Sequence, residues 1–226
     1  MIFPMIPEIW RGERAIVAAT GPSLTPDVAE ACLEARTAGT HRVLAVSDAY
    51  RLMPWADALY SLDEKWWDHH KGAKPFGGVR WSAHDETHSH KIECAARHGL
   101  RLVHGKAEKG FSTDRSCIHY CGNSGFQAVN LAIRFGAREI VLVGFNLQHV
   151  RGSSHFFGEH PEGVRKSQRS PYERFIADFV IAEKRLRLEA NPPRIINATP
   201  ATALTCFPQA SLAEALAEPS RLDNVA

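Results

Sequence analysis

The chain has 226 residues, with 27 Lys and Arg against 25 Asp and Glu, so its formal charge is only +2. A charge balance of this kind excludes the strongly basic surface typical of a nucleic-acid-binding domain. The apolar runs are far shorter than the ~20 residues of a membrane span, and Pro4 and Pro7 interrupt the N-terminus where a signal peptide would be continuous. The 5 cysteines are too sparse for a disulfide framework. We therefore expect a cytoplasmic protein.

Short apolar segments alternate with helical patterns along most of the chain. The opening reads as strand, helix, strand, over residues 15–19, 27–36 and 43–46. Further strands are predicted over 58–62, 99–105, 138–146 and 193–199, and further helices over 124–137 and 172–190. Such alternation predicts an α/β, Rossmann-like fold, with a mostly parallel sheet and helices on both faces, as a single domain over residues 1–226.

Two stretches rich in polar, aromatic and histidine residues do not follow this alternation. The first covers residues 63–91, and the second covers about 146–170. Ligands of open α/β sheets lie beyond the carboxyl ends of the strands. A long loop that follows a central strand is therefore predicted to form a lid or a wall of a site.

The first candidate site is the turn formed by Gly21, Pro22, Ser23 and Leu24. A strand that enters a helix through a glycine turn leaves backbone N–H groups unpaired, and these suit a phosphate. The sequence matches no standard phosphate-binding motif, and such a turn needs a glycine for steric reasons alone. Both interpretations stay open at this point.

A second helix start follows the same logic at Asn123, Ser124 and Gly125. The glycine allows close approach of the backbone, while Asn123 or Ser124 can cap the helix and offer a side-chain donor. Asn123 could equally be an N-cap with no further role. Two such helix starts could converge on one nucleotide.

Two aspartates and a tryptophan pair are further candidates. Asp63 ends a predicted strand and Asp48 holds the corresponding position after an earlier one, so either carboxylate could accept from a ribose hydroxyl or hold a metal. Each could instead cap a helix. Because adjacent residues on a helix point in different directions, one of Trp66 and Trp67 is expected in the core, and the other could stack on a base unless both are core.

His155 and His160 lie in the glycine-bounded stretch 152–163. A histidine near a phosphate site can act as general acid or base near neutral pH. Glycine-flanked loops also carry histidines without a catalytic role, and the chain has 12 of them. No zinc site is expected at Cys117 and Cys121, because no second pair of ligands follows at a suitable spacing.

The order of three motifs resembles a known superfamily. "ATGPSL", then "SGFQAVNLAIRFGAREIVLVGFNL", then "HFFGEHPEG" is similar to the superfamily that joins bacterial lipo-oligosaccharide sialyltransferases to hydroxymethylpterin diphosphokinase-like proteins. "PWADALYSLDEKWW", "NSGFQAVNLA", "GEHPEG" and "NATPATALTCFPQASLAEAL" also resemble proteins of tailed-phage and prophage genomes, a likeness that covers nearly the whole chain.

The sialyltransferases imply one set of roles. In them the G-P-S-L turn and the S-G helix start surround the nucleotide of a CMP-sugar, and a histidine in an H-x-x-G-H segment is the general base. Residues 21–24 and 124–125 match the first two motifs. His155 and His160 match the third with Glu159 inserted, which makes His160 the better counterpart of the catalytic histidine. Asn146 stands where that family has an aspartate at the strand end.

The diphosphokinase-like relatives imply Mg-ATP chemistry, for which Asp48 and Asp63 would suit the cation. The function expected from the sequence is a nucleotide-dependent transferase, glycosyltransferase-like or diphosphokinase-like. The alternative is a non-catalytic nucleotide-binding or particle-associated phage protein. The expected partners are a nucleotide or nucleotide-sugar donor and an acceptor of unspecified class, with a homo-oligomer left open. No cofactor is implied except Mg²⁺ in the diphosphokinase case.

Overall fold

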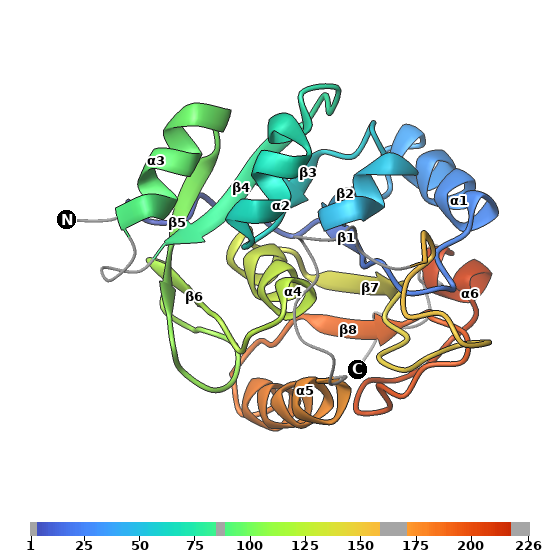
Figure 1. Cartoon of the computed structure of the whole chain (residues 1–226). Helices are drawn as coiled ribbons and strands as arrows, with labels where there is room; N and C mark the ends of the chain where they lie inside the picture. The colour runs from blue at the N-terminus through green and yellow to red at the C-terminus, as the bar shows by residue number, and fades with distance from the viewer. Residues whose placement is uncertain (1–3, 85–88, 159–170, 218–226) are drawn as a thin grey trace.

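One sheet of eight parallel strands organises the computed structural model, which describes residues 4–84, 89–158 and 171–217 (Figure 1). In space the strands run in the order β6-β5-β4-β3-β2-β1-β7-β8, and every pairing between them is parallel. The predicted α/β, Rossmann-like fold is confirmed. The strands are β1 (Arg14–Ala18), β2 (Arg42–Val46), β3 (Ala58–Tyr60), β4 (Val79–His84), β5 (Arg101–Lys106), β6 (Cys117–His119), β7 (Glu139–Val143) and β8 (Arg194–Asn197).

Helices cover both faces of this sheet, as predicted. Four α-helices pack on one face, namely α1 (Pro26–Thr37), α2 (Glu64–His69), α3 (Ser89–His98) and α6 (Leu212–Leu216). The opposite face carries α4 (Ser124–Arg134) and α5 (Tyr172–Leu186). Two 3₁₀ turns, η1 (Ser47–Arg51) and η2 (Lys71–Ala73), follow β2 and α2. Figure 1 shows α1, α2 and α3 at the top of the view and α5 at the bottom, with α4 and α6 at the height of β7.

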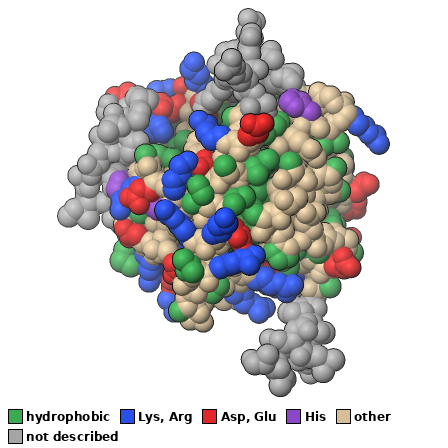
Figure 2. Space-filling view, turned by 90° about the horizontal axis from the view of Figure 1, so that it is seen from below, with side chains coloured by type: hydrophobic (Ala, Val, Ile, Leu, Met, Phe, Trp, Pro, Cys, Tyr) green, Lys and Arg blue, Asp and Glu red, His purple; other side chains and the backbone are tan. Residues whose placement is uncertain are grey.

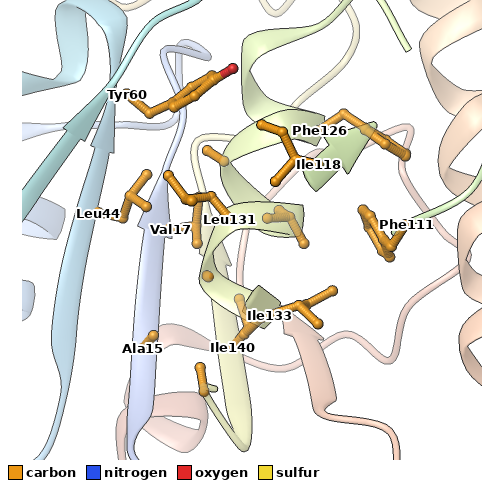
Figure 3. Close-up of a cluster of buried hydrophobic side chains, with 14 of the residues drawn as sticks. Ala15, Val17, Leu44, Tyr60, Phe111, Ile118, Phe126, Leu131, Ile133 and Ile140 are labelled. Atoms are coloured by element: carbon orange, nitrogen blue, oxygen red, sulfur yellow. The ribbon is translucent and has the colours of Figure 1, made fainter. Parts of the chain in front are cut away.

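Apart from one buried ion pair between their first residues, the central strands β1 and β7 are apolar because both of their faces are buried. Every residue of β1 and β7 is buried. Alternate side chains of β1 enter different cores, Ala15 and Val17 on the α4 side and Ile16 on the α1 side. Figure 3 shows the α4-side cluster, in which Leu131 of α4 lies between Val17 and Phe111. The apolar run at 15–19 and the apolar centre of the stretch 138–146 made these two strands predictable.

Residues 63–91 were predicted as an irregular stretch, and this prediction is wrong for most of it. The segment contains α2, η2, β4 and the start of α3. In β4 the buried polar residues Ser82 and His84 alternate with Trp81 and Ala83. This pattern gave no apolar run long enough to identify a strand, although the neighbouring strands and α3 bury it in the fold.

Helix α5 is amphipathic and gives one side of the molecule a basic surface. Phe179 and Ala182 face the core, and the buried Asp178 forms an ion pair with Lys109. Figure 2 looks at the side on which α5 lies and shows Lys and Arg side chains gathered there. The exposed basic residues of α5 are Arg174, Lys184, Arg185 and, at its C-cap, Arg187.

The two edges of the sheet differ. At the β8 edge, the N–H of Asn197 donates to the carbonyl of Pro208 (2.8 Å), and the N–H of Ala210 donates to the carbonyl of Asn197 (3.3 Å). Residues 208–210 thus continue the hydrogen bonding past the carboxyl end of β8. At the other edge, β6 has only 3 residues.

His41, which precedes β2, should make the protein sensitive to acid. The side chain is 3% exposed, and burial, with a smaller effect of the Arg14 charge, lowers its pKa from 6.5 to about 4. Below pH 6.5 the unfolded chain takes up a proton that the folded chain refuses, so stability falls by up to about 3 kcal/mol as the pH drops to 4. In urea unfolding at a series of pH values, His41→Gln should flatten this fall. Equal pH profiles for wild type and His41→Gln would contradict the assignment.

Candidate functional site

The strand order reverses between β1 and β7, and this places the candidate site. From β1 the chain continues through α1 to β2 on one side, whereas from β7 it continues through α5 to β8 on the other. Because α1 and α5 cover opposite faces, the two connections diverge at the carboxyl ends of these strands, the position at which open α/β sheets have their ligand crevice. The residues that follow the strands, 19–24 and 144–158, border it.

The backbone N–H groups of the turn after β1 are paired within the protein. The N–H of Gly21 donates to the carbonyl of Gly144 (2.8 Å), and the N–H of Leu24 donates to the carbonyl of Gly21 (3.0 Å). The N–H of Ser23 donates to Oδ1 of Asn146 (3.1 Å). The steric reason for the glycine is therefore visible, because a Cβ on Gly21 would lie 2.3 Å from that oxygen. A phosphate role for residues 21–24 stays a prediction.

Asn146 is the polar centre of the crevice. Its side chain is buried, with 1% exposed, and Oδ1 also accepts a hydrogen bond from Oγ of Ser23 (2.7 Å). Its Nδ2 donates to the carbonyls of Pro200 (2.9 Å) and Ala201 (3.1 Å). The amide thus joins the turn after β1, the end of β7 and the segment after β8. An aspartate, the residue expected from the sialyltransferase resemblance, could not make the last two bonds.

The segment 197–202 after β8 belongs to the same network, and the sequence analysis missed it. The hydroxyl of Thr199 accepts from the N–H of Phe145 (3.0 Å), and the hydroxyl of Thr202 donates to its carbonyl (2.7 Å). Asn197 donates to the Thr202 hydroxyl (3.2 Å). The motif N-A-T-P-A-T, with polar side chains directly after a buried strand, was the signal that could have identified it.

The first turn of α4 offers free backbone donors. Asn123 is the N-cap, because its side chain accepts from the N–H of Phe126 (3.0 Å). Within the part of the chain that the structure describes, the N–H groups of Ser124 and Gly125 have no acceptor. The Arg174 guanidinium is close by, since a Cβ on Gly122 would lie 3.0 Å from its Nη2. Helix N–H groups beside a guanidinium favour an anion.

The two glycine-bearing helix starts meet at the end of β7. A Cβ on Gly125 would lie 3.0 Å from the ring of Phe145, and the adjacent Asn146 holds Ser23. The Ser124 hydroxyl also accepts from the N–H of Leu62 (3.3 Å), next to the end of β3. The predicted residues of both turns are therefore brought to the carboxyl edge of the sheet.

The loop after β7 lies across the ends of β1 and β2. Nδ1 of His155 is hydrogen bonded to Oγ1 of Thr20 (3.0 Å), and the N–H of Phe156 donates to the carbonyl of Thr20 (3.0 Å). Phe157 stacks on His155 and contacts the guanidinium of Arg51 in η1. The described part of this loop, 146–158, thus brings His155 next to the Gly21 turn, and its role as a lid or wall of a site stays a prediction. His160 and Glu159 lie outside the described residues.

Asp48 and Asp63 have partners within the protein. Oδ2 of the buried Asp48 accepts from Nε1 of Trp66 (2.7 Å), and its Oδ1 lies 3.4 Å from Nε2 of His70. Asp63 is the N-cap of α2 and accepts from the N–H of Lys65 (3.1 Å). Neither belongs to a metal-compatible group of three His, Cys, Asp or Glu within the described ranges. Their ribose and Mg²⁺ roles stay predictions.

A tryptophan that stacks on a base was one expectation, and it is wrong. Trp66 and Trp67 are 1% and 0% exposed, and their rings pack edge to face. Both can be buried because each indole N–H finds a buried acceptor, Asp48 for Trp66 and the carbonyl of Ser61 for Trp67 (2.9 Å). The core interpretation holds for both.

A separate cavity of about 170 Å³ lies between the carboxyl ends of α4 and α5. Its lining includes Phe111, Arg134, Arg185 and Pro193. None of the predicted site residues lines it. It is therefore distinct from the crevice between β1 and β7.

Asn146→Asp should destabilise the fold, because the new buried carboxylate would face the two carbonyls to which Nδ2 of Asn146 now donates. We expect a loss of about 1–3 kcal/mol in urea unfolding. Gln148→Glu is the matched control, since Nε2 of Gln148 donates to the same Ala201 carbonyl (2.8 Å) at the surface. That variant should stay within about 0.5 kcal/mol of wild type. An equal loss of unfolding free energy in both variants would show that the fold does not depend on the Asn146 side chain more than on a surface hydrogen bond.

Comparison with known proteins gives a fold relationship. No family model matches the chain, and no curated protein sequence does. The solved structure of the MAf glycosyltransferase from Magnetospirillum magneticum AMB-1 is similar, with a TM-score of 0.62 and 15% sequence identity over 92% of this chain. The match covers 35% of that glycosyltransferase, so the chain spans about a third of its length. No described helix has the length and apolar character to cross a membrane. At this identity the likeness concerns the fold, and the chain shares that fold with part of a glycosyltransferase.

Proposed function

We propose that the protein is a nucleotide-dependent transferase and that its donor is a nucleotide-sugar. The observation that carries the proposal is the first turn of α4. Within the described chain the N–H groups of Ser124 and Gly125 have no acceptor, and the guanidinium of Arg174 lies close to them. A diphosphate or phosphate of a donor is the anion that such a site favours. The position at the strand reversal is where ligands of this fold class bind.

Glycosyl transfer is the better-supported chemistry. The solved structure that shares the fold is described as a glycosyltransferase. The carboxylate of Asp48, which the diphosphokinase reading would use for Mg²⁺, is already bound to the Trp66 indole and lies near His70. A metal-independent donor site therefore agrees better with these contacts than a Mg-ATP site does.

In the proposed reaction a base removes the proton of an acceptor hydroxyl, whose oxygen attacks the anomeric carbon of the donor. The nucleotide leaves with the electron pair of the broken bond, held at the α4 N-terminus. His160 is the proposed base, by its match to the H-x-x-G-H segment. His155 is already hydrogen bonded to Thr20, which fits a role in fixing the loop at the crevice.

A second candidate function, a non-catalytic nucleotide-binding or phage particle protein, has its own supporting observation. The N–H groups of Gly21 and Ser23 are paired within the protein, and Asn146 stands where the sialyltransferases have an aspartate. A chain that kept the fold and lost the chemistry would show the same features.

Donor binding should be detectable by thermal shift. We expect stabilisation by a nucleotide or nucleotide-sugar, by about 2.7 kcal/mol at a hundred times the Kd, with or without EDTA. Arg174→Gln should weaken binding about tenfold or more, because it removes a charge-assisted contact to phosphate. Arg187→Gln, on the same helix but at its far end, should not change the Kd.

The donor screen would contradict the proposal in two ways. Stabilisation that requires Mg²⁺ would favour diphosphate transfer, and the absence of any shift with nucleotides or nucleotide-sugars would remove the nucleotide site. Equal affinities for Arg174→Gln and Arg187→Gln would remove Arg174 from the site.

His160 and His155 should differ in their effect on turnover once a donor and acceptor are found. His160→Ala should lower kcat by about 10²–10⁴-fold and keep donor affinity, because it removes only the proton acceptor. His155→Ala should lower kcat mildly through a looser loop. A larger loss of kcat in His155→Ala than in His160→Ala would exchange the two assignments. If the wild type binds a donor but turns over none of the acceptors tested, the non-catalytic candidate is favoured.

A further inference from the structure

Helices α2 and α3 bring together three side chains that the proposed function does not use. Cys94 and His98 are four residues apart on α3 and therefore share one helix face. Asp68 of α2 faces them, and one ligand atom from each of the three residues lies within 4.8 Å of the others. We infer that Asp68, Cys94 and His98 form a site for a divalent transition-metal ion of the zinc class.

The orientation of the imidazole is set by its surroundings. Nε2 of His98 lies 2.7 Å from Oδ1 of Asp68, so this nitrogen points at the carboxylate. On its other side, Gly72 is so near that a Cβ there would lie 2.9 Å from Nδ1. Arg97 donates to the same Asp68 oxygen (2.7 Å) and holds the carboxylate from outside. Ligands oriented by such outer contacts are typical of metal centres.

The set of donors selects the class of ion. A thiolate, an imidazole and a carboxylate together suit zinc, whereas Mg²⁺ and Ca²⁺ prefer oxygen ligands only. Zinc bonds of about 2.0–2.3 Å place tetrahedral ligand atoms roughly 3.3–3.8 Å apart, so the three groups need only small shifts. Coordination releases the thiol proton and the proton between His98 and Asp68 to solvent. A water or Glu64, one turn before Asp68 on α2, would complete the set.

The local charge also favours a cation. Cys94 is 2% exposed, and the negative charges of Asp68 and Glu64 act on its thiol, opposed by the charge of Arg97. The ion would neutralise these charges and pin α2 to α3. His98 lies at the carboxyl end of α3, just before β5, so the site is remote from the carboxyl edge of the sheet where the donor is proposed to bind.

Cobalt titration of the full-length, chelator-treated protein tests the site. Co²⁺ should bind with a stoichiometry of one per chain and give a thiolate-to-cobalt charge-transfer absorption that zinc abolishes. Cys94→Ala should eliminate this absorption. Cys32→Ala is the matched control, because Cys32 is equally buried on the same face of the sheet but outside the cluster, and it should retain the absorption.

Two further variants keep the test decisive where Cys94→Ala does not fold. His98→Gln and Asp68→Asn should each weaken Co²⁺ and Zn²⁺ binding at least tenfold, and zinc should raise the melting temperature of wild type more than that of either variant. A folded wild type without the thiolate absorption, or unchanged affinity in the variants, would overturn the proposal. In that case Asp68 and His98 form only an ion pair between two helices.

Discussion

The carboxamide of Asn146 is the contact on which the carboxyl edge of the sheet depends. It accepts from Ser23 and donates to the carbonyls of Pro200 and Ala201, so three chain segments share one buried side chain. A buried amide is stabilising only when both its donor and its acceptor groups are paired. The turns that follow β1, β7 and β8 are therefore tied to one another at the carboxyl edge of the sheet. The loop 146–158 and the first turn of α4 lie at the same edge, and they carry the groups of the proposed ligand site.

Segments whose burial is uniform were predictable from the sequence. β1, β2 and β7 are apolar after their first residues because helices cover both faces, and the predicted helix over 172–190, which contains α5, shows a clear amphipathic period. β4 and β6 were not recognised, since buried polar residues such as Ser82 and His119 interrupt their apolar pattern. Such residues are tolerated through tertiary contacts, for example the bond from Nδ1 of His119 to the carbonyl of Gly110 (2.9 Å), and no local pattern records those contacts.

The helix starts of the candidate site could be predicted from the sequence, whereas the partners of their backbone and side-chain groups could not. Glycines at 21 and 125 correctly marked the helix starts at the carboxyl edge, because glycine is required where backbone segments approach closely. In the turn after β1, the N–H of Ser23 is paired with Asn146, a residue more than a hundred positions away in the sequence. Likewise, the sequence offered Asp48 as a ligand or a helix cap, and neither alternative contains the hydrogen bond that it accepts from the Trp66 indole of α2. Local sequence thus predicts where hydrogen-bond donors lie, but tertiary contacts determine which of these donors remain unpaired.

The edges of the sheet have a consequence for how copies of the protein can meet. An exposed strand edge is a template onto which another chain can add by backbone hydrogen bonding, and long flat edges promote aggregation. Here residues 208–210 occupy the carboxyl end of the β8 edge, and β6 offers only 3 residues at the opposite one. Growth of the sheet from one molecule into the next is therefore disfavoured at both sides. Contacts between copies at high concentration would have to use helix and loop surfaces, which keeps the parallel core out of intermolecular assembly.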